Sequence, residues 1–183
     1  QTFSEEALKV LAFAYKTIDK KVSSEDAYFQ EEKNLILVGI IGLKDPARKN
    51  VANAIKTCRE AHIRPIMLTG DNLATALAIG KEVGICTSDD EGINASDLNN
   101  LKPREVMEYV SKYSVFARVS PENKVQIVKA LQKMGKVVAM TGDGVNDAPA
   151  MKLANVGVGM GKSGTDVTKN VADIILLDDS YNT

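Results

Sequence analysis

Apolar and polar positions follow one another in a pattern that predicts helices and strands along almost the whole chain. Apolar residues recur at helical spacing from Ser4 to Lys20 and predict an amphipathic helix, which a polar loop over 21–34 follows. The apolar run Leu35–Ile41, rich in β-branched residues, predicts a buried strand. Beyond it we expect helices 47–61, 74–83, 103–112, 121–134, 147–154 and 165–171, and strands 65–68, 114–117, 136–140, 156–160 and 173–177.

Strands that alternate with helices through short connections are typical of βαβ units. We therefore expect an α/β fold with a mostly parallel sheet and helices on both of its faces. Ligands of such sheets bind at the carboxyl ends of the strands. The polar stretch 87–101, which carries two runs of acidic or amide side chains, is predicted to be an exposed excursion from this core.

Two of the predicted strands end in almost the same way. Residues 66–68 run into Thr-Gly-Asp-Asn at 69–72, and residues 137–140 run into Thr-Gly-Asp-Gly-Val-Asn-Asp at 141–147. Glycine lets the backbone approach a ligand, a helix start offers N–H groups to an oxyanion, and Asp carboxylates suit Mg²⁺. One such copy would more often be a plain turn and helix cap. Two copies at successive strand ends favour a phosphoryl-binding site.

A lysine is predicted close to the same edge. Ser-Pro-Glu-Asn-Lys at 120–124 opens a helix directly after a strand, so Lys124 falls in the first turn of that helix. A lysine there can neutralise a phosphoryl group as a point charge. Taken alone, Lys124 would more often be an ordinary surface lysine. The neighbouring motifs give it functional weight.

Composition excludes several classes of partner. Lys and Arg number 23 against 24 Asp and Glu, and the net charge of −1 gives no reason to expect nucleic acid. The longest apolar run is much shorter than the ~20 residues of a membrane-spanning helix. Cys58 and Cys86 have no metal-ligand spacing, and we expect both thiols to be reduced. The chain begins at Gln1 rather than Met, so we expect it to be cut from a longer protein.

Four motifs, in this order along the chain, resemble those of P-type ATPases. The resemblance extends from about residue 6 to residue 179 and is closest to the calcium-pump branch. The most specific motif is Val-Asn-Asp-Ala-Pro-Ala at 145–150. The four motifs lie at 45–48, 67–72, 116–124 and 140–150.

The resemblance implies a Rossmann-like phosphorylation domain of the haloacid dehalogenase type, in which an Asp attacks the γ-phosphate of ATP and becomes an aspartyl-phosphate. Carried over by motif, Asp143 would ligate the catalytic Mg²⁺. Lys124 would balance the charge of the phosphoryl group. Thr69 and Gly70 would hold phosphoryl oxygens. Asn146 and Asp147 would shape the site and support the metal shell, and Asp147 is also expected to be a metal ligand.

The same resemblance implies a second group of residues around the nucleotide. Asp71 and Arg118 would lie toward it, and Asp45 and Arg48 would lie near the hinge to the nucleotide-binding domain. Thr141 and Gly142 are assigned to cofactor binding with them. ATP would be the substrate and Mg²⁺ the cofactor.

One motif of the family is not found in the sequence. The nucleophile of P-type ATPases lies in Asp-Lys-Thr-Gly-Thr, and these 183 residues do not contain that motif. We therefore interpret 1–34 as the tail of the nucleotide-binding domain and its connector, and 35–183 as a phosphorylation domain without its nucleophile segment. The fragment alone is expected neither to phosphorylate itself nor to turn over ATP.

The missing segment has a structural consequence in the family fold. Its strand runs through the middle of the sheet, between the two strands that end in Thr-Gly-Asp. We therefore predict a rearranged sheet, a sheet completed by a partner, or a companion segment outside this chain. Three smaller departures are read as tolerated variation: Ala47 where a second Pro is common, His62 where Gly is usual, and Asn155 where Asp is frequent. His62 is expected to be a surface or helix-end residue rather than a ligand.

The resemblance also predicts the parent protein and its partners. This would be the cytoplasmic domain of an integral membrane pump, working with its nucleotide-binding domain, nucleophile segment, membrane helices, ATP and a transported cation. Calcium rests on overall similarity alone, because sodium, proton and magnesium pumps share these motifs. The alternatives are a phosphatase of the same superfamily and a non-catalytic module that binds Mg²⁺ and phosphate.

Overall fold

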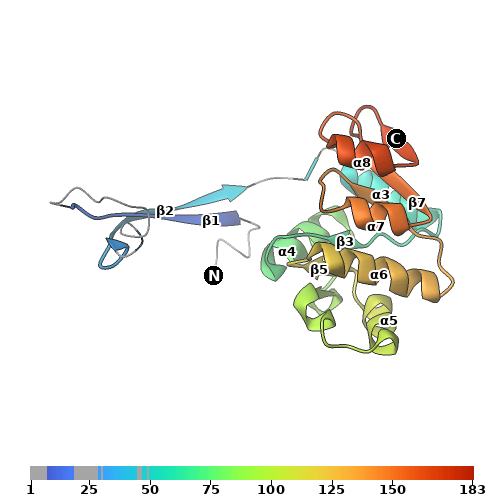
Figure 1. Ribbon diagram of the computed structural model, residues 1–183, viewed down its shortest axis with the longest axis horizontal. Coiled ribbons are helices and arrows are strands. Elements are labelled where there is room, and N and C mark those ends of the chain that lie inside the picture. The colour runs from blue at the N-terminus through green and yellow to red at the C-terminus, as the bar shows by residue number, and fades with distance from the viewer. Residues whose placement is uncertain (1–7, 19–28, 30, 45–46, 49) are drawn as a thin grey trace. The chain divides into compact units, whose positions relative to one another are not determined.

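The chain forms two compact units. The computed structural model describes residues 8–18, 29, 31–44, 47–48 and 50–183. By its internal contacts the chain divides into a first unit, Gln1–Asp45, and a second unit, Pro46–Thr183 (Figure 1). The strand that follows Asn34 belongs to the first of these units by its contacts. The origin of each unit within a longer protein stays a prediction.

The first unit is a two-stranded antiparallel ribbon. Strand β1 (Leu8–Tyr15) pairs with β2 (Ile36–Lys44), with a shift of register between Phe13 and Ala14. The helix predicted from residue 4 to residue 20 is therefore wrong over β1. The segment carries Val, Phe and Tyr, which suit strands, and pairing with β2 overrides its weak helical periodicity.

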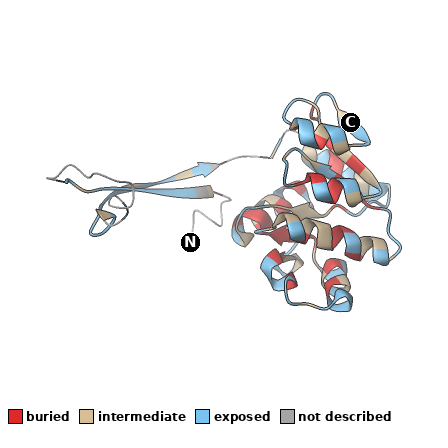
Figure 2. Cartoon of the chain, viewed as in Figure 1, coloured by how far each residue is buried: buried red, intermediate tan, exposed pale blue. Residues whose placement is uncertain are grey.

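The strand predicted over 35–41 is confirmed, but its burial is not. Ile36 is 56% exposed and Val38 is 67% exposed. None of the described positions of β1 and β2 is buried, as the absence of red along this ribbon in Figure 2 shows. A two-stranded ribbon has no third strand or helix to cover its faces, so its apolar side chains stay accessible.

The described residues of the second unit contain two parallel sheets of three strands each. The first has the order β3-β5-β4 and the second has the order β6-β7-β8. All neighbours within them run parallel. The strands are β3 (Met67–Leu68), β4 (Gly92–Asn94), β5 (Val115–Ala117), β6 (Ala139–Gly142), β7 (Val156–Met160) and β8 (Ile174–Leu176).

In the described residues of this unit, six α-helices and two short 3₁₀ turns accompany these strands, so the expected mixed α/β architecture with parallel strands is confirmed. The helices predicted from residue 47 onward agree with the structure to within a few residues. Among the described residues, no helix has both the length and the apolar character needed to cross a membrane. The helices are α3 (Val51–Glu60), α4 (Leu73–Val83), α5 (Pro103–Lys112), α6 (Pro121–Lys133), α7 (Ala148–Leu153) and α8 (Asp166–Val171), and the 3₁₀ turns are η1 (Asp89–Glu91) and η2 (Ala95–Leu98).

The stretch 87–101 is not the exposed excursion that we predicted. It contains β4, which extends the first sheet, and its apolar residues enter the core: Ala95 and Leu98 are fully buried. The acidic residues of η1 remain outside. The sequence did not predict β4 because the stretch is mostly polar and contains only a few apolar side chains to be buried.

The core joins the two sheets, although their strands do not form one sheet in the part of the chain that is described. Leu68, at the end of β3, packs against the cluster around Phe116 and also against the cluster around Met140. Strands β3 and β6 are each at an edge of their own sheet. The two strands that end in Thr-Gly-Asp are therefore not hydrogen-bonded neighbours.

Candidate functional site

The first Thr-Gly-Asp loop links β3 to α4. The Thr69 hydroxyl donates to Asp71 Oδ2 at 3.0 Å and accepts from the Asp71 N–H at 3.1 Å. Asn72 then caps α4, because its side chain accepts from the Thr75 N–H at 3.0 Å. Gly70 is exposed, and a Cβ added there would have no atom within 4 Å. The loop therefore presents an accessible backbone beside a hydroxyl and a carboxylate.

The segment after β5 is joined to this loop by backbone hydrogen bonds. The Arg118 N–H donates to the Asp71 carbonyl and the Val119 N–H donates to the Thr69 carbonyl, both at 3.0 Å. Arg118 has φ of 52°, in the left-handed region that is costly for a residue with a side chain. These contacts place Arg118 next to Asp71, and the expectation that both lie toward a nucleotide stays a prediction.

Helix α6 begins at this point and orients Lys124. Ser120 and Asn123 form a reciprocal cap, and Pro121 occupies the first turn. Lys124 Nζ then lies 2.5 Å from Asp147 Oδ1, with the two side chains only 15% and 11% exposed. This ion pair connects the helix that follows the first sheet to the loop after β6.

Asp147 is closely packed in the second Thr-Gly-Asp loop. Its other carboxylate oxygen, Oδ2, accepts from the Gly144 N–H at 3.1 Å, and its own N–H donates to the Gly144 carbonyl at 2.9 Å. Gly142 has no room for a side chain, because an added Cβ would lie 2.7 Å from Asp147 Cγ and 2.9 Å from Met151 Sδ. The glycine of this second motif is therefore a packing requirement, unlike Gly70.

Asp143 is the exposed carboxylate of the second loop. Its backbone carbonyl accepts from the Thr165 N–H at 2.9 Å and from the Thr168 hydroxyl at 3.4 Å. Among the described residues, no hydrogen bond to the Asp143 carboxylate is found. Mg²⁺ typically takes one or two protein carboxylates and keeps several waters. An accessible carboxylate with a fixed backbone, beside a second Asp, fits that requirement.

These residues lie at the ends of strands β3, β5 and β6 or just beyond them, a set that we call the polar edge. The sequence model of haloacid dehalogenase-like hydrolases matches residues 2–155. The chain belongs to this hydrolase family. Its parallel strands, with Thr-Gly-Asp loops at two strand ends, agree with that assignment.

Several relatives of this haloacid dehalogenase-like chain are transport ATPases. It is 47% identical over 182 residues to calcium-transporting ATPase 1 of Bacillus cereus and 46% identical over 178 residues to the calcium-transporting ATPase of Bacillus subtilis. It is 42% identical over 204 aligned residues to P-type sodium-transporting ATPase4 of Toxoplasma gondii. The predicted resemblance to P-type ATPases is thus confirmed. The alignments cover 100%, 97% and 98% of this chain but only 20%, 20% and 15% of those relatives.

The remaining predicted residues lie in different places. Asn146 and Thr141 are exposed on the second loop and strand β6. Asp45 is outside the described residues. Arg48 does not reach the polar edge: its Nη1 donates to the backbone carbonyl of Asp179 at 2.5 Å.

Sequence reasoning did not predict the role of Asp179. This residue is 8% exposed, and its carboxylate accepts from the Lys162 N–H at 2.8 Å and the Ser163 N–H at 2.7 Å. The hydrogen bond from Lys162, reinforced by the one from Ser163, lowers the pKa of Asp179 to about 2. No sequence signal marks this contact, because the partners lie on a different loop.

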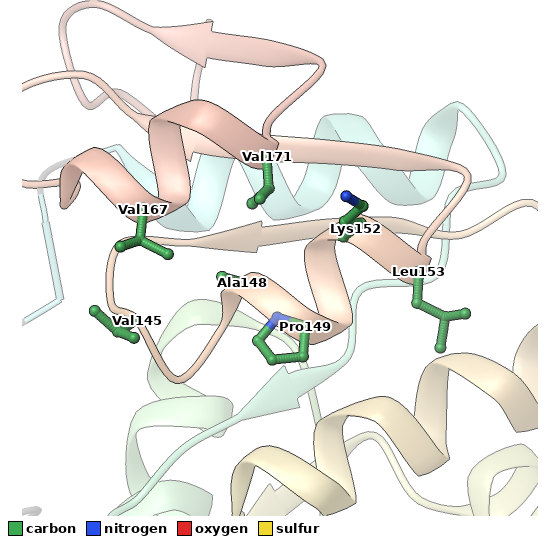
Figure 3. Close-up of a pocket in the computed structure, with 7 residues that line it drawn as sticks. All are labelled: Val145, Ala148, Pro149, Lys152, Leu153, Val167 and Val171. Atoms are coloured by element: carbon green, nitrogen blue, oxygen red, sulfur yellow. The ribbon is translucent and has the colours of Figure 1, made fainter.

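An apolar pocket adjoins the second loop but holds none of the predicted polar residues. The pocket has a volume of about 500 Å³ and lies between α7 and α8. Figure 3 shows the side chains that line it. All of its lining side chains except Lys152 are apolar, so the pocket suits apolar contacts. The lining residues are Val145, Ala148, Pro149, Lys152, Leu153, Val167 and Val171.

Proposed function

We propose that this chain is the phosphorylation-domain region of an ATP-driven cation pump of the P type. It would supply the Mg²⁺- and phosphoryl-binding part of a site where an aspartate receives the γ-phosphate of ATP. Identity of 46–47% to calcium-transporting ATPases over nearly the whole chain supports this proposal. The chain spans about a fifth of those relatives, so transport and partners are properties of a longer protein.

The ion pair of Lys124 with Asp147 is the observation that carries the proposal. A lysine and an aspartate that are mostly withdrawn from water pay a desolvation cost, so their pairing at 2.5 Å is weak evidence for stability alone. The pair stands at the strand ends, and Asp147 shares its loop with the exposed Asp143. An ammonium held there is available to balance an incoming phosphoryl group, which is the main task of a phosphoryl-transfer site.

We assign the other residues by the groups they present. The Thr69 hydroxyl and the open backbone at Gly70 would bind phosphoryl oxygens, and exposed Asn146 would contact the ligand or its waters. Asp71 and Arg118 would extend this surface toward the nucleotide. Thr141 and Gly142 would support the same edge from β6. All of these groups act by positioning and by charge, and none forms a bond to phosphorus.

Asp143 is the residue that would hold Mg²⁺. When bound, the ion would neutralise developing charge on the phosphoryl oxygens and orient them. Both carboxylate oxygens of Asp147 already have partners, Lys124 Nζ and the Gly144 N–H. Asp147 therefore orients the lysine and the loop first, and its place in the metal shell is secondary to that of Asp143.

The nucleophile would come from a segment outside these 183 residues. We infer that its strand lies between β3 and β6, since both are edge strands with unpaired backbone groups on one side. The end of β3 packs against the clusters of both sheets through Leu68, which supports a common core on either side of such a strand. Without that segment, the chain alone is expected to be inactive toward ATP.

Strand β1 of the exposed ribbon would belong to the neighbouring nucleotide-binding domain, and its partner β2 would begin the phosphorylation domain. A ribbon of two strands is marginal by itself, and apolar side chains on both strands are accessible. We propose residues 1–34 as the tail of that domain and 35–183 as the phosphorylation domain, in a cytoplasmic part of a membrane pump. Calcium is the proposed ion because the relatives at 47% and 46% identity are calcium-transporting ATPases, although a sodium-transporting relative matches at 42%.

Calorimetric titration with orthovanadate, a phosphate analogue, tests the proposed site on the chain itself. We expect binding that requires Mg²⁺, with loss of at least tenfold in affinity for Lys124→Met and for Asp143→Asn. Glu122→Gln, a matched change in the same helix turn as Lys124, is expected to bind as the original chain does. Vanadate binding that ignores Mg²⁺ and both substitutions would contradict the proposal.

Turnover separates the two alternatives. Hydrolysis of p-nitrophenyl phosphate by the chain would favour a phosphatase, because a pump fragment without its nucleophile segment is expected to be inactive. Mg²⁺-dependent vanadate binding without turnover of ATP or of the ester agrees with the proposed pump fragment. A free-standing binding module would give the same result, and the sequence surrounding this chain in its gene distinguishes these two.

A further inference from the structure

The backbone of Asp143 is held by hydrogen bonds from the start of α8. The Asp143 carbonyl accepts hydrogen bonds from the Thr165 N–H and the Thr168 hydroxyl. Thr165 is the N-cap of α8, and Thr168 is fully buried. Any shift of this helix start therefore moves the backbone that carries the Asp143 carboxylate.

The loop between β7 and α8 has little freedom to move independently. A Cβ on Gly161 would lie 2.8 Å from the Leu176 carbonyl oxygen, and a Cβ on Gly164 would overlap the Met160 carbonyl oxygen. Real Cβ atoms do not approach backbone this closely, so the loop backbone is packed against its neighbours without space for side chains.

Asp179 holds the middle of this loop. Its two carboxylate oxygens accept separately from the Lys162 and Ser163 N–H groups, at 2.8 and 2.7 Å. Asp179 adopts φ of 56°, a left-handed conformation that glycine adopts freely and that Asp tolerates better than most residues. The carboxylate thus satisfies the hydrogen-bonding capacity of two backbone amides in the loop. Asp179 is near the end of the chain, and this end lies beside α8 in Figure 1.

Arg48 extends the same set of contacts toward the boundary between the two units. Its guanidinium donates to the Asp179 carbonyl at 2.5 Å, while the Asp179 N–H donates to Leu176 at 3.1 Å. Every polar group of Asp179 is therefore engaged, on one side by Arg48 and on the other by the loop that precedes α8.

We propose that Asp179 is a positioning residue for Asp143, acting through the 161–164 loop and the N-cap of α8, and that Arg48 holds Asp179 in place. The proposal rests on the proposed function in one respect, the assignment of Mg²⁺ to Asp143. It predicts that groups remote from the metal determine its affinity, as the residues that orient metal ligands generally do.

Metal titration of the chain tests this proposal. We expect Asp179→Gly, which keeps the left-handed conformation but removes the carboxylate, to raise the Kd for Mg²⁺ about tenfold. Asp179→Asn keeps one acceptor and is expected to give a smaller increase. Asp178→Asn is the matched control: Asp178 bonds only Ser180 and Thr183 among the described residues, so its loss is expected to leave the Kd within twofold.

Hydrogen exchange without metal supplies an independent readout. In Asp179→Gly, the Thr165 amide that donates to Asp143 is expected to exchange at least tenfold faster, whereas the Val156 amide, bonded to Val138, keeps its rate. A uniform change of both amides would mean loss of global stability and would overturn the positioning role.

The two proposals fail in distinguishable ways. If the chain binds Mg²⁺ and Asp143→Asn abolishes binding, unchanged affinity in both Asp179 variants overturns the positioning role alone. If the chain does not bind Mg²⁺, or Asp143→Asn binds normally, the metal assignment is wrong. The Thr165 amide then decides separately whether Asp179 orders the Asp143 loop.

Discussion

The two Thr-Gly-Asp motifs contain glycines that predict opposite results on substitution. Gly142→Ala places a Cβ 2.7 Å from Asp147 Cγ and 2.9 Å from Met151 Sδ, in a region where Met151 is fully buried. Gly70→Ala places a Cβ where no atom lies within 4 Å. Substitution by Ala therefore produces a steric clash at Gly142 and none at Gly70.

The expected cost at Gly142 follows from these contacts. Overpacking a closely packed site costs about 1–3 kcal/mol. The added Cβ would clash with Asp147 Cβ and Cγ, which lie near the backbone and cannot move away easily, so we expect the upper part of that range. Displacing Asp147 also strains its pairing with Lys124. We expect a loss of about 3 kcal/mol in the free energy of unfolding, roughly a hundredfold in the equilibrium constant. Gly70→Ala is expected to change it by less than about 0.5 kcal/mol.

Urea unfolding followed by circular dichroism measures both variants. Repeating Gly142→Ala in a Lys124→Met background tests the route of the effect, because loss of a shared ion pair makes the two changes non-additive. Equal stability of Gly142→Ala and Gly70→Ala would refute the packing argument. Additive effects would show that the clash does not act through the ion pair.

Two further predictions concern backbone conformation and pH. His62 follows α3 with φ of 59°, so His62→Gly is expected to raise the free energy of unfolding by about 1 kcal/mol, measured by urea unfolding; a decrease would contradict this. The pKa of Asp179 is about 2 when folded, below its unfolded value of about 3.9, so its contribution is present above pH ~4 and lost as the pH falls toward 2. Urea unfolding at several pH values is expected to show a shallower acid loss for Asp179→Asn than for the original chain, and identical slopes would contradict the assignment.

Local signals predicted the elements around α6 well. Ser120, Pro121 and Asn123 mark the helix start within a few residues, and the cap that they form is the one observed. Lys124 could therefore be placed in the first turn and near the strand ends from sequence alone. The His62 prediction of a helix-end residue is confirmed for the same reason, since its position just after α3 is a local property.

Contacts between distant segments could not be predicted in this way. The local periodicity of β1 predicted a helix, but pairing with β2 determines its conformation. Because β2 begins about twenty residues after β1 ends, a local pattern could not reveal this pairing. Strand β4 was hidden in a polar stretch whose order depends on a parallel neighbour. The contacts of Asp179 with Arg48 and with the 161–164 loop join separate parts of the chain, so no periodicity or motif announces them.

Sequencing the gene on both sides of this chain tests the central claim most directly. The account predicts an upstream Asp-Lys-Thr-Gly-Thr motif, a nucleotide-binding segment between that motif and this chain, and apolar stretches of ~20 residues that span a membrane. A reading frame confined to these 183 residues, with neither the motif nor such stretches, would contradict it and favour a binding module without a nucleophile.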